Sequence, residues 1–278
     1  MKSRKTENHY WLASVDMDGT LLMSDKTVHP DTVRDLEEAN RRGIAVSYCS
    51  GRSVAEIMPY RDALPMIRYG ILTSGAVVYD FQEMRSIFFR PIPGQYADLL
   101  VKTAEKYRAM LHFLMEEESI VGASDVTHMA DFHMGVYQQT FHDVMRMVPS
   151  MAEEAKKPAG IAKLNIYFRS EEDRQKAYEE LRHLPLTMIF SEETSLEVNA
   201  EGVTKALGLS VLCDHLGIPV EKTIGIGDAE NDRAFLEAAG LSVAMGNAGE
   251  SIAAVCDAVT ADNDHNGVGE ALRKYCFA

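Results

Sequence analysis

Short apolar runs alternate with helix-like segments in both outer parts of this 278-residue chain. An apolar run from His9 to Asp16 is followed by a helix that Pro30 can open and then by a second apolar run, IAVSYC. Near the other end, the runs TIGIG and LSVAMG alternate with helices in the same way. Runs that are apolar throughout are typical of strands buried on both faces, and strands that alternate with helices form parallel sheets. We therefore predict an α/β fold whose Rossmann-like, mostly parallel sheet has helices on both faces.

The middle of the chain has a different pattern, in which hairpin-like strand pairs are mixed with helices from about Arg90 onward. The two outer blocks then form halves of one open α/β domain, and the middle block is an insertion. We expect a core of residues 1–83 and 189–278, with an inserted α+β cap domain over residues 84–188.

Composition and charge exclude several classes of protein. Asp and Glu number 42 against 28 Lys and Arg, so the net charge of -14 repels a phosphate backbone and excludes nucleic acid as a partner. No apolar run approaches the roughly 18 residues that a membrane helix needs, and the N-terminal run is too short for a signal peptide, so we expect a cytoplasmic protein without a membrane partner. No C-x-x-C pair occurs among the cysteines, which predicts neither disulfides nor zinc.

The strongest local motif is Asp16-Met17-Asp18-Gly19-Thr20, which begins where the first apolar run ends. In open α/β sheets, ligands bind at the carboxyl ends of the strands, so these two carboxylates are expected to face a crevice. One carboxylate can attack an electrophilic centre while the other transfers a proton. Alone, the motif is equally consistent with an acidic turn.

A second acidic motif, Gly227-Asp228-Ala229-Glu230-Asn231-Asp232, directly follows the run TIGIG. Asp228 and Asp232 are four residues apart and can lie close together on one helical turn. Together with Asp16 they would suit Mg²⁺, which prefers oxygen ligands. Alone, this motif also fits a helix N-terminus with acidic first-turn residues.

Two further positions can hold a phosphate group. Ser50 and Gly51 follow the run IAVSYC, where a hydroxyl and backbone N–H groups at a helix start can bind phosphate oxygens. Lys205 lies early in the helix after LEVN and supplies a positive charge. Each residue alone is more simply a helix cap or a solvated lysine, but four such sites in this order favour one constellation.

In chain order, these motifs resemble those of the haloacid dehalogenase (HAD) superfamily of phosphotransferases, specifically its Cof-like branch with a type IIB α/β cap. The match runs from Asp16 to Asp232 and extends beyond it, so it covers the whole core, whereas the cap matches only in length and general pattern. Asp18 and Ser50 are 32 positions apart, but Ser50 and Lys205 are 155 apart, so the cap lies in the second interval.

The resemblance implies a role for each matched residue in phosphoryl transfer. Asp16 would be the nucleophile that accepts the phosphoryl group, and Asp18 the general acid and base. Ser50 with Gly51, and Lys205, would bind the phosphate.

The resemblance also implies a Mg²⁺ site. Its ligands would be the side chains of Asp16 and Asp228 and the backbone carbonyl of Asp18. Asn231 and Asp232 would support the metal and the lysine.

The residues that recognise the substrate are the part of the site that the sequence determines least. Arg52 and Asn247 are candidates for substrate contact because their motifs resemble family positions at the mouth of the site. Ser74 stands where relatives usually have Asn, which affects the cap hinge or the substrate mouth. The cap histidines match no metal-binding spacing and are expected at the surface or the substrate mouth; they are His112, His128, His133 and His142.

The sequence thus predicts a Mg²⁺-dependent phosphomonoester hydrolase acting on a small phosphorylated metabolite, with sugar phosphates favoured by the resemblance. Two alternatives remain open: a phosphosugar mutase of the phosphomannomutase type and a non-catalytic sensor of phosphorylated metabolites. The sequence does not determine the substrate or the oligomeric state.

Overall fold

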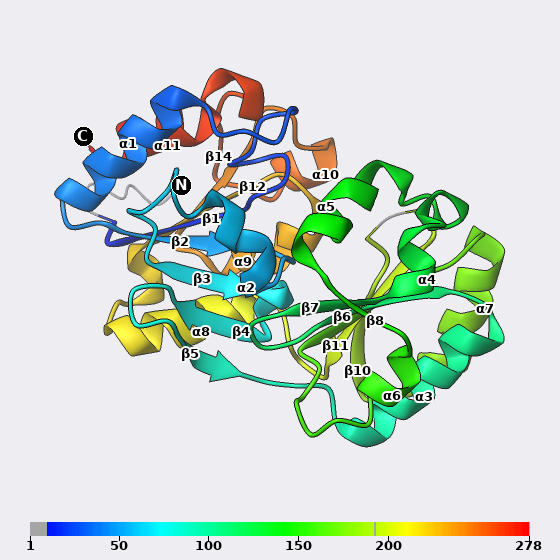
Figure 1. The fold of residues 1–278 in the computed structure, drawn as a ribbon. Helices are drawn as coiled ribbons and strands as arrows, with labels where there is room; N and C mark the ends of the chain where they lie inside the picture. Colours follow the sequence, from blue (N-terminus) through cyan, green and yellow to red (C-terminus); the bar gives the residue numbers. More distant parts are fainter. Residues whose placement is uncertain (1–9, 192, 278) are drawn as a thin grey trace.

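The computed structural model describes residues 10–191 and 193–277, so the start of the first predicted strand, His9, lies outside the described residues. The chain forms two lobes, each with its own sheet (Figure 1). One lobe holds an eight-stranded sheet in the order β14-β13-β12-β1-β2-β3-β4-β5, and the other a six-stranded sheet in the order β10-β11-β9-β6-β7-β8.

The core sheet is parallel from β14 through β3, and β4 and β5 extend it as antiparallel edge strands. Its strands are β1 (Leu12–Val15), β2 (Ala45–Cys49), β3 (Tyr69–Leu72), β4 (Val77–Asp80), β5 (Arg85–Phe89), β12 (Thr223–Gly227), β13 (Leu241–Ala244) and β14 (Ala258–Val259). Its helices are α1 (Pro30–Arg41), α2 (Val54–Ile57), α8 (Lys205–Leu216), α9 (Arg233–Ala238), α10 (Glu250–Ala253) and α11 (Gly267–Tyr275). The mostly parallel α/β sheet predicted from the sequence is confirmed.

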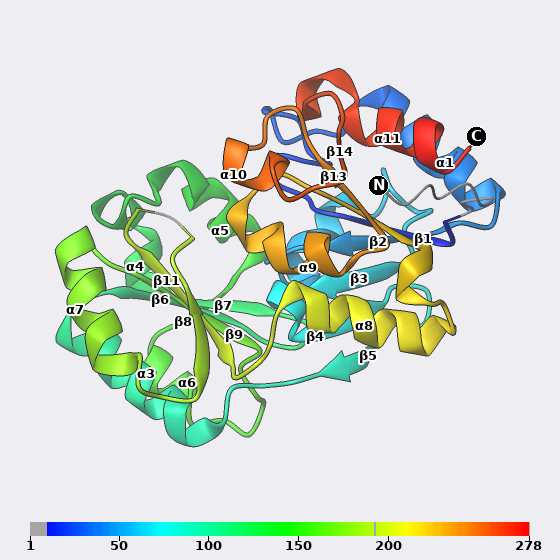
Figure 2. The ribbon, with the colours of Figure 1, turned by 180° about the vertical axis from the view of Figure 1, so that it is seen from behind.

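Helices cover both faces of the core sheet, as Figures 1 and 2 show. Successive residues of β1 point to opposite faces: Ala13 and Val15 pack in the cluster with α1 and α11, whereas Leu12 packs with α8 and α9. This two-sided burial explains why the core strands lack the polar alternation of a solvent-exposed sheet.

The cap sheet is antiparallel except for the parallel pair β7 and β8. Its strands are β6 (Met110–Leu114), β7 (Ser119–Gly122), β8 (Arg146–Val148), β9 (Lys163–Tyr167), β10 (Leu186–Ile189) and β11 (Ser195–Ala200). The cap helices are α3 (Gly94–Lys106), α4 (Ala123–Val126), α5 (Gln138–Val144), α6 (Met151–Glu154) and α7 (Glu171–Leu181). Short 3₁₀ turns complete the chain: η1 (Met58–Tyr60), η2 (Thr73–Gly75), η3 (Met129–Phe132), η4 (Gly135–Tyr137), η5 (Val220–Lys222), η6 (Glu230–Asp232) and η7 (Asn263–His265).

The chain passes from the core sheet to the cap sheet, and back again, at later residues than the predicted domain boundaries of 83/84 and 188/189. β5 pairs with β4 and therefore belongs to the core sheet, although it was assigned to the cap. β11 pairs with β9 and β10 in the cap sheet, although LEVN was assigned to the core. An apolar strand does not reveal from its own sequence which of two sheets it joins, because both sheets bury apolar faces.

Among the described residues, no helix is both long and apolar enough to cross a membrane.

Candidate active site

Three neighbouring parallel strands bring acidic and hydroxyl side chains to one edge of the core sheet. β1 ends directly before Asp16, β2 before Ser50 and β12 before Asp228. The strands lie in the order β12-β1-β2, so their carboxyl ends share this edge. Residues far apart in the chain thereby become neighbours.

Lys205 reaches the same edge from the first position of α8. Thr204 caps this helix by accepting a hydrogen bond from the Leu207 backbone N–H at 3.2 Å. Lys205 Nζ donates to Asp16 Oδ1 at 2.7 Å and to Asp232 Oδ1 at 2.6 Å, and all three side chains are buried. One ammonium group thus links the first acidic motif to the second.

Burial and neighbouring charges shift the pKa values of this cluster. Burial is the largest reason that the pKa of Asp16 lies well above its usual value, and the charge of Asp232 reinforces it while Lys205 opposes it. Burial disfavours the charged form of Lys205, yet the two carboxylates outweigh it and raise the pKa of the ammonium. The cluster therefore holds more negative charge than Lys205 compensates, which favours a further cation.

Three carboxylates, from Asp16, Asp228 and Asp232, each offer an oxygen within 4.8 Å of the others. Asp232 is engaged elsewhere, because Oδ1 binds Lys205 and Oδ2 accepts the backbone N–H groups of Asp228 and Ala229, both at 3.1 Å. Burial, reinforced by Asp232, raises the pKa of Asp228 to about 6. Buried oxygen ligands of this kind fit Mg²⁺, so Asp16 and Asp228 are the side chains that could hold it.

Gly19 is required by the close approach of the Asp228 loop. Its φ is +80°, and a Cβ at this position would lie 2.4 Å from Asp228 Oδ2. Asn247, a predicted substrate contact, donates from Nδ2 to the Gly19 carbonyl at 2.8 Å and accepts the Asn263 N–H at 3.2 Å. In this structure Asn247 therefore braces the turn, and its role in substrate contact stays a prediction.

Asp18 is paired with two cations. Arg52 donates from Nε to Oδ2 at 2.7 Å and from Nη2 to Oδ1 at 2.8 Å, and Lys26 Nζ donates to Oδ1 at 3.0 Å. Burial alone would raise the pKa of Asp18, but these hydrogen bonds and charges outweigh it and lower the pKa to about 2. The carboxyl is therefore ionised in this arrangement, and the predicted substrate contact Arg52 is bound to it.

A cavity of about 330 Å³ lies between the cap sheet and the edge of the core sheet at which β1, β2 and β12 end. Most of the predicted site residues line its core side: Asp16, Asp18, Ser50, Gly51, Arg52 and Asn231. Ser50 is buried, and its Oγ accepts the Arg52 backbone N–H at 3.2 Å. Ser50, the predicted phosphate-binding residue, and Asp16, the predicted nucleophile, thus line the same cavity.

The cap side of the cavity contains residues that the sequence analysis missed, among them Lys163, Asn165 and Glu197. The segment IAKLNIYF alternates: Leu164 and Ile166 pack in the cap core, whereas Lys163 and Asn165 face the cavity. This period-two pattern was a usable signal, because it indicates a strand with one apolar and one polar face.

Lys163 joins the cap to the core at the cavity wall. Its Nζ forms an ion pair with Glu197 at 2.6 Å and donates to the Gly51 carbonyl and to Ser74 Oγ, both at 3.3 Å. Ser74 has a left-handed backbone with φ of 59°, a conformation that Asn tolerates better than most residues. The usual Asn at this position thus has a backbone rationale, and Ser74 contributes its hydroxyl to the cap contact.

His112 is buried in the cavity wall, whereas His128, His133 and His142 are exposed. Burial is the main reason that the pKa of His112 falls to about 4; Lys163 adds to the shift, and Glu56 and Glu197 oppose it. The unfolded chain, with a histidine pKa near ~6.5, binds the extra proton between about pH 6.5 and 4. We expect the folded protein to lose up to about 3 kcal/mol of stability as the pH falls through this window.

Urea unfolding of wild-type and His112→Phe protein from about pH 7.5 to 5 measures this loss. The difference between the two curves isolates His112, because both proteins share all other titrating groups. Parallel curves would contradict a neutral, buried His112.

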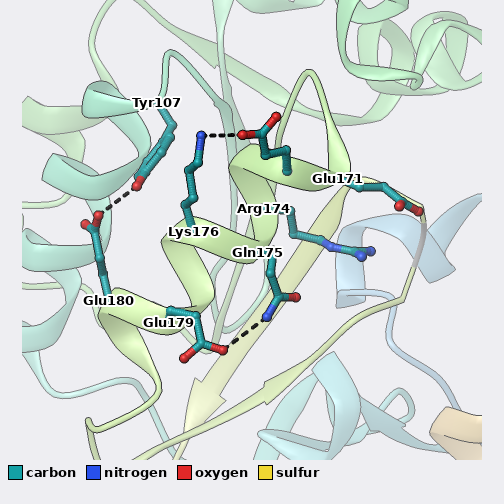
Figure 3. A pocket seen from close by; sticks show the side chains of 8 residues that line it. Tyr107, Glu171, Arg174, Gln175, Lys176, Glu179 and Glu180 are labelled. Atoms are coloured by element: carbon teal, nitrogen blue, oxygen red, sulfur yellow. Dashed lines mark hydrogen bonds and ion pairs between the residues drawn. The ribbon is translucent and has the colours of Figure 1, made fainter.

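Another hollow lies along the outer side of α7, and Figure 3 shows its lining. Its polar groups largely pair with one another: Lys176 with Glu172 at 2.7 Å, Tyr107 with Glu180 at 2.7 Å, and Gln175 with Glu179 at 3.1 Å. None of the predicted catalytic residues lines it. It has the character of a solvated helix face.

The fold and the site define a class: an α/β protein with an inserted cap and an aspartate–lysine cluster at the carboxyl edge of a mostly parallel sheet. The sequence model of the haloacid dehalogenase-like hydrolase family matches residues 13–272. The chain therefore belongs to the HAD superfamily, as its motifs indicated, and it is a phosphatase of this superfamily.

The similarity to named proteins covers nearly the full chain. The phosphatase YwpJ of Bacillus subtilis is 29% identical, over 94% of this chain and 98% of its own. The 5-amino-6-(5-phospho-D-ribitylamino)uracil phosphatase YcsE of the same organism is 26% identical, over 95% of both chains. A solved HAD-like hydrolase from B. subtilis superposes with a TM-score of 0.82 at 28% identity, over 95% of this chain and 99% of its own.

Proposed function

We propose that this phosphatase hydrolyses phosphomonoesters of small metabolites in two Mg²⁺-dependent steps through an aspartyl phosphate on Asp16. The observation that carries the proposal is the geometry of Asp16 and Lys205. Asp16 lines the cavity at the end of β1, and Lys205 holds its Oδ1 at 2.7 Å, which leaves Oδ2 for attack on phosphorus. When bound, Mg²⁺ supplies positive charge that offsets the repulsion between the carboxylate and the phosphate.

The remaining residues bind the phosphoryl group and move protons. Ser50 Oγ, the Gly51 N–H and Lys205 hold its oxygens. In the first step, Asp16 Oδ2 forms a bond to phosphorus and the ester oxygen leaves with a proton from Asp18. In the second step, Asp18 takes a proton from water, whose oxygen attacks phosphorus, so that phosphate is released and the Asp16 carboxylate is restored.

The pairing of Asp18 with Arg52 bears on the order of these steps. The ionised Asp18 described above is in the state required to activate water in the second step. For the first step, Asp18 must carry a proton, so Arg52 has to release it. The phosphate of a bound substrate is the alternative anionic partner for Arg52, consistent with the predicted role of Arg52 in substrate contact.

The relatives and the cavity both support the proposed substrate class. The relatives are phosphatases, and the name of one specifies the phosphate ester 5-amino-6-(5-phospho-D-ribitylamino)uracil. Together with the polar residues on the cap side of the cavity (the cap wall: His112, Lys163, Asn165 and Glu197), this supports a small phosphorylated metabolite as the substrate, with sugar phosphates as our first candidates. Cytoplasmic location stays a prediction from the sequence.

Phosphate release from phenyl phosphate tests this function. We expect release with added Mg²⁺ and about a hundredfold slower release with excess EDTA, because the Asp16 and Asp228 carboxylates would then repel the phosphate. Restored release on adding Mg²⁺ back is the control. Equal release with and without metal would contradict the Mg²⁺ dependence. Turnover only with a sugar bisphosphate, giving an isomerised sugar phosphate, would instead identify a mutase, and binding without turnover would identify a sensor.

A further inference from the structure

The cap wall of the cavity contains polar atoms that lack a partner among the described residues. His112 is 2% exposed, and neither of its ring nitrogens forms a hydrogen bond. Asn165 is 6% exposed; its Nδ2 donates to the Tyr167 hydroxyl at 3.1 Å, but its Oδ1 accepts no hydrogen bond. Both side chains line the cavity.

Strand register makes these residues neighbours. His112 on β6 pairs with Asn165 on β9, and Asn165 pairs with Glu197 on β11. Side chains of residues paired in this way lie side by side on one face of a sheet. His112, Asn165 and Glu197 therefore form a polar row across three strands of the cap, facing the catalytic edge of the core.

Unpaired polar atoms in such a row indicate a ligand. A neutral imidazole presents one donor and one acceptor, and the amide oxygen of Asn165 is a further acceptor. Buried polar groups are nearly always hydrogen-bonded, because leaving them unpaired destabilises the protein. A substrate in the cavity can supply the missing partners.

The charged side chains near the cap end of the cavity disfavour a second anionic group on the substrate, beyond its reacting phosphate. Of the described cap residues that line the cavity, Lys163 is the cation, and its Nζ already contacts Glu197, the Gly51 carbonyl and Ser74 Oγ. The core cations at the cavity, Lys26 and Arg52, are paired with Asp18. Glu56, which also lines the cavity, adds a further carboxylate. A second anionic group on the substrate would meet uncompensated negative charge here.

An aromatic contact holds the row in place. The ring of Phe141 lies 5.0 Å from the His112 ring, centroid to centroid, and Phe141 also lines the cavity. The side chain of His112 thus has an apolar support on one side while its nitrogens remain available. This arrangement presents the donor and the acceptor at a fixed position, which favours selective binding.

We propose that His112 and Asn165 are specificity-determining residues that bind the leaving group of the substrate, and that this leaving group is neutral and carries hydroxyl or amide groups. The same wall selects against leaving groups with a second phosphate or a carboxylate. The inference rests on the proposed phosphatase function and adds the chemistry of the substrate to it.

Matched phosphate esters test the charge selection. The wild-type values of kcat/KM are measured with Mg²⁺ for glucose 6-phosphate, ribose 5-phosphate and sorbitol 6-phosphate, for the charged counterparts 6-phosphogluconate and glucose 1,6-bisphosphate, and for phenyl phosphate. We expect the best neutral sugar ester to exceed both charged counterparts and phenyl phosphate by about tenfold or more. Equal or greater kcat/KM for a charged counterpart would overturn the inference.

Two variants test the residues, with an exposed cap histidine as the matched control. In His112→Phe and Asn165→Leu, the ratio of kcat/KM for the best neutral ester to that for phenyl phosphate is expected to fall about tenfold, whereas His128→Phe leaves it unchanged. In the absence of substrate, His112→Phe is expected to raise the Tm by about 2 °C or more at neutral pH, because it removes two unpaired buried nitrogens.

Failure of the leaving-group assignment can be distinguished from failure of the proposed phosphatase function. An unchanged ratio in both variants, or a lower Tm for His112→Phe, would assign His112 a structural role and overturn the inference. No phosphate release from phenyl phosphate by the wild type would instead overturn the proposed function, and the leaving-group assignment with it.

Discussion

Replacing Asp16 by Asn is expected to reduce Mg²⁺-dependent phosphate release by about 10⁴-fold or more, because the carboxamide cannot form the phosphoryl intermediate. Asn keeps the shape of the side chain, and Lys205 retains its second partner, Asp232, at 2.6 Å. Steady-state release from phenyl phosphate, measured with equal concentrations of wild-type and variant protein, gives the size of the loss.

Stability distinguishes lost chemistry from lost folding in this variant. The raised pKa of Asp16 means that the folded protein holds the charged carboxylate at a cost. The neutral Asn removes the repulsion from Asp232, so in EDTA the variant should be at least as stable as the wild type. Asp98→Asn, on the exposed surface of α3, is the matched control and should leave activity unchanged. Activity of Asp16→Asn within about tenfold of wild type would overturn the nucleophile assignment.

The core of the site was predictable because each motif directly follows its own strand. Asp16, Ser50 and Asp228 each come immediately after an apolar run, and neighbouring parallel strands end at one edge. Local sequence therefore indicated the place of these residues once the parallel sheet was recognised, and the chemical roles assigned to them stay predictions. Membership of the HAD superfamily followed from the same motifs.

The pairing of Asp18 with Arg52 was not predictable in the same way. The two residues are 34 positions apart, and their hydrogen bonds depend on the loop geometry after β1 and β2. The sequence indicated that both face the site, but not that they bind each other. An ion pair of this kind stabilises the ionised form of Asp18, which suits its proposed role as the base of the second step and opposes its proposed role as the acid of the first.

The cap wall required knowledge of strand register. His112 and Asn165 are neighbours only because β6 and β9 pair antiparallel in one particular register. A shift by one residue would turn Asn165 away from the cavity and bring Leu164 or Ile166 to face it. The period-two pattern of β9 predicts a polar face, but which residues of other strands share that face is a property of the assembled sheet.

Replacing Lys205 by Met is the second change with a large expected effect. The variant leaves the buried carboxylates of Asp16 and Asp232 without their shared cation. Removing one partner from a buried ion pair costs about 3–5 kcal/mol, and loss of a charge that stabilises the transferring phosphate costs about 10²–10³-fold in kcat. Thermal unfolding and phosphate release from phenyl phosphate measure the two losses.

The dependence on pH and metal shows whether charge causes these losses. Without Lys205, the pKa of Asp16 rises further above its unfolded value, so the folded variant binds a proton more readily than the unfolded chain. Its stability deficit should therefore shrink as the pH falls from about 7.5 to 5.5, and Mg²⁺ should restore part of the Tm at the higher pH. Lys102→Met, which removes an exposed ion pair with Asp98, should show neither effect. A deficit for Lys205→Met that is independent of both pH and Mg²⁺ would mean that packing of the lysine stem, and not its charge, stabilises the site.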